Sequence, residues 1–341
     1  MSWFNIEFGD FAKTFLSVIF EGVPFLLLGA LISGLVDVHI SSERITRMLP
    51  KQPAAAIAVA GLLGLFIPIC ECGSVIIIRR FLKKGLPLSV ATAYMLAAPI
   101  VSPIVGYTTW VAFTGQQPEV MTASRLIMGY LVAVSAALVI HNLPQSRIAQ
   151  EGIATSSRRR TGLSIAGAPD GSEPPDFATM AASASPLRKL LLAIQSATAD
   201  FLDVAFYFVI GVAITSVFSA GVHREALAPI AEAPVTSIVV LMIVAALLAL
   251  CSTTDAFVAA VQFSQFSPAA NLAFLLFGPV FDLKLFWLYG LIFKRKFVVV
   301  LALGLFILIA ILSMLWGSMD LIKKGGSGTG SIVCNPAIRV V

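Results

Sequence analysis

Charged residues are scarce in this chain. Asp, Glu, Lys and Arg make up 12% of its 341 residues, while hydrophobic residues make up 58%. A soluble domain usually has about 25% charged and 45–50% apolar residues, so the composition excludes a soluble enzyme and a disordered chain. The apolar runs are continuous rather than alternating, which argues against a membrane β-barrel. The fold class predicted is an all-α polytopic membrane protein in contact with the lipid bilayer.

Cysteine is also rare. The four cysteines (Cys70, Cys72, Cys251 and Cys334) are too few and too unevenly spaced for a disulfide framework. No Walker A motif is present, so the chain is not expected to hydrolyse ATP. The net charge of +5 is typical of basic cytoplasmic loops and does not indicate nucleic-acid binding. We expect no cofactor and no enzymatic activity.

Eight apolar runs approach the length of about 20 residues that a helical span needs. They lie near 14–37, 54–70, 86–113, 122–141, 197–220, 234–251, 268–293 and 297–317. The composition of 143–189 is typical of a flexible cytoplasmic linker. The predicted organisation is a four-span repeat over 1–142, this linker, a second four-span repeat over 190–322 and a flexible tail over 323–341.

The two halves resemble each other at a nearly constant offset. Pro53 matches Pro234 and Cys70 matches Cys251, 181 residues apart in both cases. Internal repeats are common in secondary transporters, where the substrate site lies between them. Four spans in each half would make the repeats parallel, whereas a half-helix that crosses the membrane would make them inverted. Both arrangements stay open.

The basic residues predict an orientation. With both termini and the linker in the cytoplasm, more Lys and Arg lie inside than outside, as the positive-inside rule requires. The segment Arg79–Lys84 then lies inside as an anchor, or as a site that attracts anions. The cluster Lys294–Lys296 lies outside and is the exception. The expected location is the inner (cytoplasmic) membrane.

The most distinctive motif is Pro-Ile-Cys-Glu-Cys-Gly at 68–73. Pro68 removes a backbone donor and Gly73 permits unusual backbone angles, so a broken helix is predicted. Such a break is tolerated at membrane depth where it lines a cavity. Cys70, Glu71 and Cys72 put sulfur beside oxygen, which suits a thiophilic ion such as Zn²⁺ or Cu⁺, or a trivalent metalloid. The alternative is that the cysteines are small buried hydrophobes.

The matching segment of the second half again combines a thiol, hydroxyls and a carboxylate, from Cys251 to Asp255. A carboxylate in an apolar run costs on the order of 3 kcal/mol on insertion scales, so Asp255 is expected to face a polar pathway. It could also cap the following helix. Cys70, Cys72 and Cys251 are the predicted ligands of the transported ion.

Further carboxylates lie in or near the apolar runs. Glu21 and Asp203 are predicted to relay protons together with Glu71, and Asp282 is expected to pair with Lys284.

A second break is predicted in each half. Pro99 and Pro103 interrupt the first half, and Pro279 interrupts the second, where Ser102 and Asp282 could offer oxygen ligands. Paired interruptions of this kind point to a transport site.

These motifs resemble a known family. The segments PICECG, RRFLKKGLP, AAPIVSP, LCSTTDAFVAA and FGPVFDLK are similar to the bacterial predicted permeases that include the arsenic permease ArsP and the YcgR-like permeases, over about 10–318. The C-E-C form is closer to the YcgR-like branch. The resemblance implies an inner-membrane permease, efflux of trivalent arsenicals or soft metals, and a small partner membrane protein.

The predicted function is therefore export of a thiophilic metal ion, a trivalent metalloid or an organoarsenical in exchange for protons. One alternative is a membrane subunit or scaffold of a two-protein complex, and another is a thiol-redox membrane protein that uses Cys70 and Cys72. A homo-oligomer is a further option.

Overall fold

The computed structural model describes residues 8–39, 50, 52–67, 69–150, 186–221 and 234–325. Pro68, most of the predicted linker, and the tail with Cys334 lie outside the described residues. Within the described part the chain is helical, and its one extended contact is a bridge between Ala149 and Phe293. The prediction of an all-α protein is confirmed.

Within the described residues, each half contains six main helices. In the first half they are α1 (Phe8–His39), α3 (Pro53–Leu62) with the 3-10 turn η1 (Leu63–Leu65), α4 (Glu71–Lys83), α5 (Leu88–Ala97), α6 (Pro103–Ala112) and α7 (Pro118–His141), followed by the short α8 (Gln145–Ile148). In the second half they are α11 (Pro186–Gly221), α12 (Pro234–Leu248), α13 (Thr254–Gln262), α14 (Pro268–Val280), α15 (Leu283–Tyr289) and α16 (Arg295–Gly325). In the part of the chain that the structure describes, both halves thus run from a long helix through four short helices to a second long helix.

Among the described residues, five stretches are long and apolar enough to cross a bilayer. They are Phe11–Val36, Pro118–His141, Leu187–Val217, Pro268–Tyr289 and Arg295–Ser318. Three of the eight predicted runs instead contain shorter apolar helices, at Pro53–Leu65, Leu88–Ala97 and Val235–Leu248. Proline explains several of the helix starts, because it stands at the first position of α3, α6, α7 and α14, where no backbone donor is needed.

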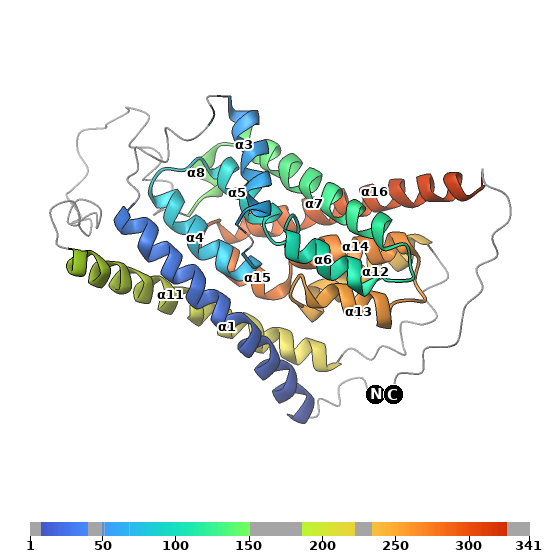
Figure 1. Cartoon of the computed structure of the whole chain (residues 1–341), viewed down its shortest axis with the longest axis horizontal. Coiled ribbons are helices and arrows are strands. Elements are labelled where there is room, and N and C mark those ends of the chain that lie inside the picture. The colour runs from blue at the N-terminus through green and yellow to red at the C-terminus, as the bar shows by residue number, and fades with distance from the viewer. Residues whose placement is uncertain are drawn as a thin grey trace.

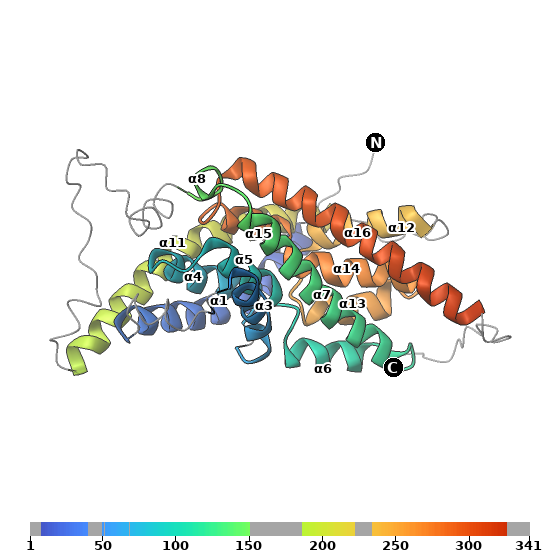
Figure 2. The ribbon, with the colours of Figure 1, turned by 90° about the horizontal axis from the view of Figure 1, so that it is seen from above.

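The long helices enclose the short ones. Figures 1 and 2 show α1 and α11 side by side at one end of the molecule, with α7 and α16 on the other side and most of the short helices between them. The short helices also connect the halves, since α4 packs on α15 and α13 packs on α6. The boundary between the halves therefore runs through the interrupted helices.

Glycine brings α1 and α4 into close contact. A Cβ added at Gly29 would lie 3.0 Å from the carbonyl oxygen of Gly73. Gly73 is the third residue of α4, so it lies in regular helix and does not itself form the predicted break. Its small size serves helix packing instead.

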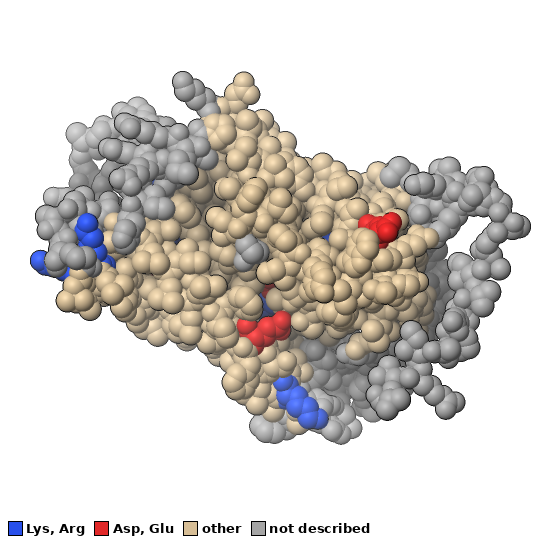
Figure 3. Space-filling view, viewed as in Figure 1, with Lys and Arg blue, Asp and Glu red and all other residues tan. Residues whose placement is uncertain are grey.

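The outer surface is apolar. Large side chains such as Phe20, Val139, Leu202 and Leu303 are more than half exposed on the long helices. On the face in Figure 3, charged atoms are confined to a few small patches among uncharged ones. Extended exposed apolar surface is expected where a helix meets lipid.

Candidate functional site

Each half contains an interrupted helix. In both halves, a cysteine carbonyl accepts a hydrogen bond at the start of the helix that follows the interruption. In the first half, regular helix ends at Leu65 and α4 begins at Glu71, and the carbonyl of Cys70 accepts a hydrogen bond from the Ser74 amide at 3.0 Å. In the second half, α12 ends at Leu248 and α13 begins at Thr254, and the carbonyl of Cys251 accepts from the Asp255 amide at 3.0 Å. Both matched cysteines therefore precede the helix that follows the interruption: Cys70 lies directly before α4, and Cys251 lies three residues before Thr254 of α13.

The two interruptions meet at one cavity. Its polar lining consists of Cys70, Glu71 and Cys72 from the first half, Cys251 and Lys284 from the second half, and Glu21 of α1. Apolar side chains of α1 and α11 complete the wall. The cavity has a volume of about 20 Å³, which is room for about one water-sized particle. In this conformation the site can hold only a very small species.

Lys284 is the cation of this site. Its side chain is 4% exposed, and its Nζ lies 3.0 Å from Glu71 Oε1 and 3.3 Å from Asp282 Oδ2. Nζ also donates a hydrogen bond to the carbonyl of Ala249 at 2.9 Å. Asp282 has a second task, because its Oδ1 accepts from the Leu285 amide at 2.7 Å and caps α15. The expected pairing of Asp282 with Lys284 is present.

Backbone strain accompanies the lysine contact. Ala249 has a φ of +45°, in the left-handed region that costs an L-residue about 1 kcal/mol or more. This angle ends α12 and leaves the Ala249 carbonyl to accept from Lys284 rather than from a following helical amide.

Glu21 connects α1 to the second interruption. Its Oε1 accepts a hydrogen bond from the Thr254 hydroxyl at 3.1 Å, and its side chain lines the cavity. Two of the three predicted proton-relay residues, Glu21 and Glu71, therefore lie at the same cavity.

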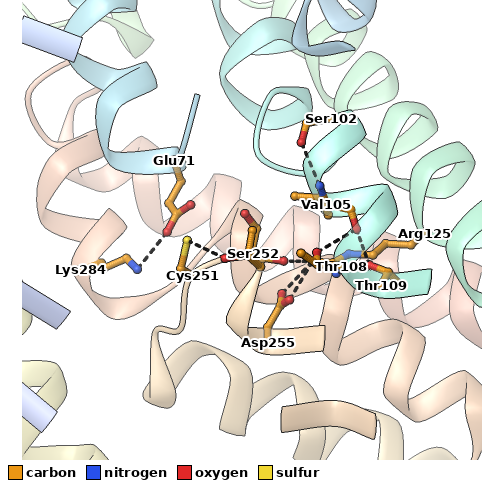
Figure 4. Close-up of polar contacts among 11 residues, drawn as sticks. Glu71, Ser102, Val105, Thr108, Thr109, Arg125, Cys251, Ser252, Asp255 and Lys284 are labelled. Atoms are coloured by element: carbon orange, nitrogen blue, oxygen red, sulfur yellow. Dashed lines mark hydrogen bonds and ion pairs between the residues drawn. The ribbon is translucent and has the colours of Figure 1, made fainter. Parts of the chain in front are cut away.

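Asp255 belongs to a separate buried network. Both of its carboxylate oxygens accept from Arg125 Nη2 at 2.9 Å. The same guanidinium donates to the Ser252 carbonyl and to the Thr109 hydroxyl, each at 2.8 Å. Figure 4 shows this network and the Glu71–Lys284 pair on opposite sides of Cys251. Arg125 is fully buried and was not identified from the sequence, where its only signal was a single Arg within an apolar run.

The remaining predicted site residues lie elsewhere. Ser102 caps α6 by accepting from the Val105 amide at 3.2 Å. Asp203 pairs with Arg79 at 3.0 Å, and its side chain is 59% exposed. Neither residue lines the cavity.

The Arg pair of α4 has defined partners on α11. Arg80 contacts Asp200 at 2.7 Å, and Ser33 of α1 donates to the same carboxylate at 2.7 Å. These bonds tie the end of α4 to both long helices, which is a more specific role than anchoring at a membrane surface.

The proline breaks fall close to their predicted places. Regular helix stops at Ala97 and resumes at Pro103, so the chain is interrupted across Pro99. Pro279 lies in the last turn of α14, which ends one residue later.

The thiols do not form a ready metal site in this conformation. Among the described residues, no group of three His, Cys, Asp or Glu side chains is placed to hold a metal ion together. A soft ion shared by Cys70, Cys72 and Cys251 would therefore require α4 to move relative to the turn before α13. The cavity brings together three thiols, two carboxylates and one ammonium group.

Comparison with known proteins agrees with this architecture. Residues 7–318 match the family ArsP_1, described as "Predicted permease". The chain is 32% identical over 287 residues to "UPF0718 protein YcgR" of Bacillus subtilis, covering 84% of this chain and 90% of that protein. It is 30% identical over 284 residues to the "Putative two-component membrane permease complex subunit" of Streptococcus mutans, covering 83% and 87%.

No solved structure matches the chain. The family match spans nearly the whole sequence, and the alignments cover most of the length of both relatives. Together with the apolar helices, the family match indicates a multi-pass membrane permease. The chain belongs to the ArsP_1 family of predicted permeases.

Proposed function

We propose that this permease exports a small thiophilic cation or a trivalent metalloid compound across the inner membrane in exchange for protons. The observation that carries the proposal is the convergence of Cys70, Cys72 and Cys251, from both halves, on one cavity that also contains Glu21 and Glu71. Cysteines that served only as small hydrophobes would have no reason to gather beside carboxylates.

The proposed exchange of protons for the cation follows from the fact that cysteine binds a metal as its thiolate. A thiol must lose its proton to bind a soft cation, so binding releases protons. Glu21 and Glu71 are close enough to the thiols to receive such protons, because they line the same cavity. Exchange of protons for the cargo would then occur at one place in the protein.

The position of the site suits alternating access. We take 1–142 and 190–322 as the two repeats, connected by the predicted linker at 143–189. The described ends of this linker are helical, in α8 (Gln145–Ile148) and at the start of α11 (Pro186). A site at their boundary can open to either side when one repeat moves against the other.

A sensitivity panel in a deletion strain tests the proposal. Wild type should restore growth on one or more of Zn²⁺, Cd²⁺, Cu⁺ and trivalent arsenicals, whereas Cys70→Ser and Cys251→Ser should not. Cys334→Ser is the matched control and should protect like wild type, since Cys334 belongs to the predicted tail and not to the motifs of the proposed site. Full protection by both site variants, at equal membrane levels, would contradict the proposal.

A second candidate function is that of a membrane subunit that needs a partner protein. The name of the Streptococcus mutans relative supports it, because that protein is described as a complex subunit. Reconstitution of the purified chain alone in proteoliposomes separates the two cases. Uptake of cargo by the single chain would show that no partner is needed.

A further inference from the structure

The backbone around Lys284 is fixed from two sides. A Cβ added at Gly211 of α11 would lie 2.9 Å from the Lys284 Cα, so the two helices touch at this point. Asp282 caps the same helix one residue before it begins. The backbone at Lys284 is therefore held in place. Any movement of the ammonium group must come from the lysine side chain.

Three oxygens from three parts of the chain surround the ammonium. They belong to Glu71 in α4, Ala249 in the turn after α12, and Asp282 before α15, at 3.0, 2.9 and 3.3 Å. Nζ donates a hydrogen bond to the Ala249 carbonyl and forms ion pairs with the two carboxylates. The same oxygens would also suit a small cation, which means that the ammonium occupies a place where a cation could bind.

Glu71, which lines the cavity, has one carboxylate oxygen that is free to accept a ligand. Its Oε2 is buried and has no hydrogen-bond partner among the described residues. A buried acceptor without a partner is unfavourable, and Cys70, Cys72 and Cys251 line the same cavity. The unpartnered oxygen beside the thiols is therefore a point at which a cation would gain its first ligands.

The charges of the cluster do not balance. Glu71 and Asp282 carry two negative charges against the single positive charge of Lys284, and each of these residues is at most 3% exposed. Such a cluster favours one more positive charge. When that charge arrives at Glu71, Lys284 still has Asp282 within 3.3 Å as its partner.

We infer that Lys284 is a tethered competitor of the transported cation: its ammonium occupies the Glu71 site while the pathway is empty, and moves towards Asp282 when the cation binds. The inference rests on the proposed function at the same cavity. It makes Lys284 a residue that sets affinity, because a cation that first contacts Oε2 must displace the ammonium from Oε1 before it can bind both oxygens of Glu71.

The test is calorimetric titration of the purified full chain with Zn²⁺. Asp282→Asn/Lys284→Gln removes the competitor but leaves the cluster with the same net charge as wild type, and Asn keeps the helix cap. It should bind Zn²⁺ at least tenfold more tightly than wild type. Asp282→Asn alone is the matched control and should bind no more tightly than wild type. Equal or weaker binding by the double variant would overturn the inference.

Lys284→Arg provides an independent test if the double variant does not fold. A guanidinium keeps the charge and holds a carboxylate with two parallel bonds, so it should be harder to displace. It should bind Zn²⁺ several-fold more weakly than wild type, and equal or tighter binding would overturn the inference. Cys70→Ser distinguishes a failure of the Lys284 inference from a failure of the proposed function. If Cys70→Ser binds Zn²⁺ as tightly as wild type, the proposed function itself fails.

Discussion

Removing Arg125 should destabilise the fold far more than removing Arg125 and Asp255 together. Arg125 is fully buried and makes four hydrogen bonds, two of them to Asp255. Arg125→Met leaves an uncompensated buried carboxylate, which costs about 3–5 kcal/mol, whereas replacing a whole buried pair by apolar residues is often close to neutral. A chain of this length loses roughly 1–2 °C of Tm per kcal/mol. We therefore expect a fall of about 5 °C for the single variant.

Thermal unfolding of purified protein in detergent measures this effect. Arg125→Met/Asp255→Leu should recover at least half of the lost Tm, which a double-mutant cycle reports directly. The same double variant examines the expectation that Asp255 faces the transport pathway. A stable but inactive double variant would support that role, and a stable active one would assign Asp255 to structure. A wild-type Tm for Arg125→Met would refute the reasoning about the buried pair.

Three further predictions concern packing, ion pairs and orientation. Gly29→Val should lower Tm and membrane levels, because the valine side chain would meet the α4 backbone. Gly304→Val should be tolerated, because no atom lies within 4 Å of a Cβ added there. Equal effects of the two substitutions would contradict this prediction. Arg80→Ala should lower Tm more than Arg79→Ala, because the first arginine pairs with a buried aspartate and the second with an exposed one; the reverse order would be inconsistent with the geometry. A single cysteine placed at 158 should resist an impermeant maleimide in intact cells, since the linker is expected in the cytoplasm; rapid labelling would reverse the predicted orientation.

Much of the helical organisation was accessible from the sequence because it depends on local signals. Proline and composition marked the interruptions, and the offset between Cys70 and Cys251 linked them. The tertiary contact of the two interruptions then brought the thiols to one cavity. The pair of Asp282 and Lys284 was also accessible, because the two residues are close in sequence.

The missed features depend on contacts between distant segments. Arg125 binds Asp255, which is 130 residues away in the sequence, and no local pattern identifies that partner. Gly73 was read as a break because glycine permits unusual backbone angles, but the close approach of α1 explains it better.

Asp203 was predicted to relay protons, but it does not line the cavity. It lies five residues before Phe208, which lines the cavity from α11. Five residues of helix advance about 7.5 Å along the axis, and the Asp203 carboxylate pairs with Arg79 at 3.0 Å. The partner on α4 cannot be identified from the sequence around Asp203.

X-ray absorption at the zinc edge tests the central claim most directly. The purified chain loaded with one equivalent of Zn²⁺ should show sulfur ligands at about 2.3 Å, and their number should fall in Cys70→Ser and in Cys251→Ser, because the thiols of both halves bind the same ion. A shell of only oxygen and nitrogen at about 2.0–2.1 Å, unchanged in both variants, would contradict the account.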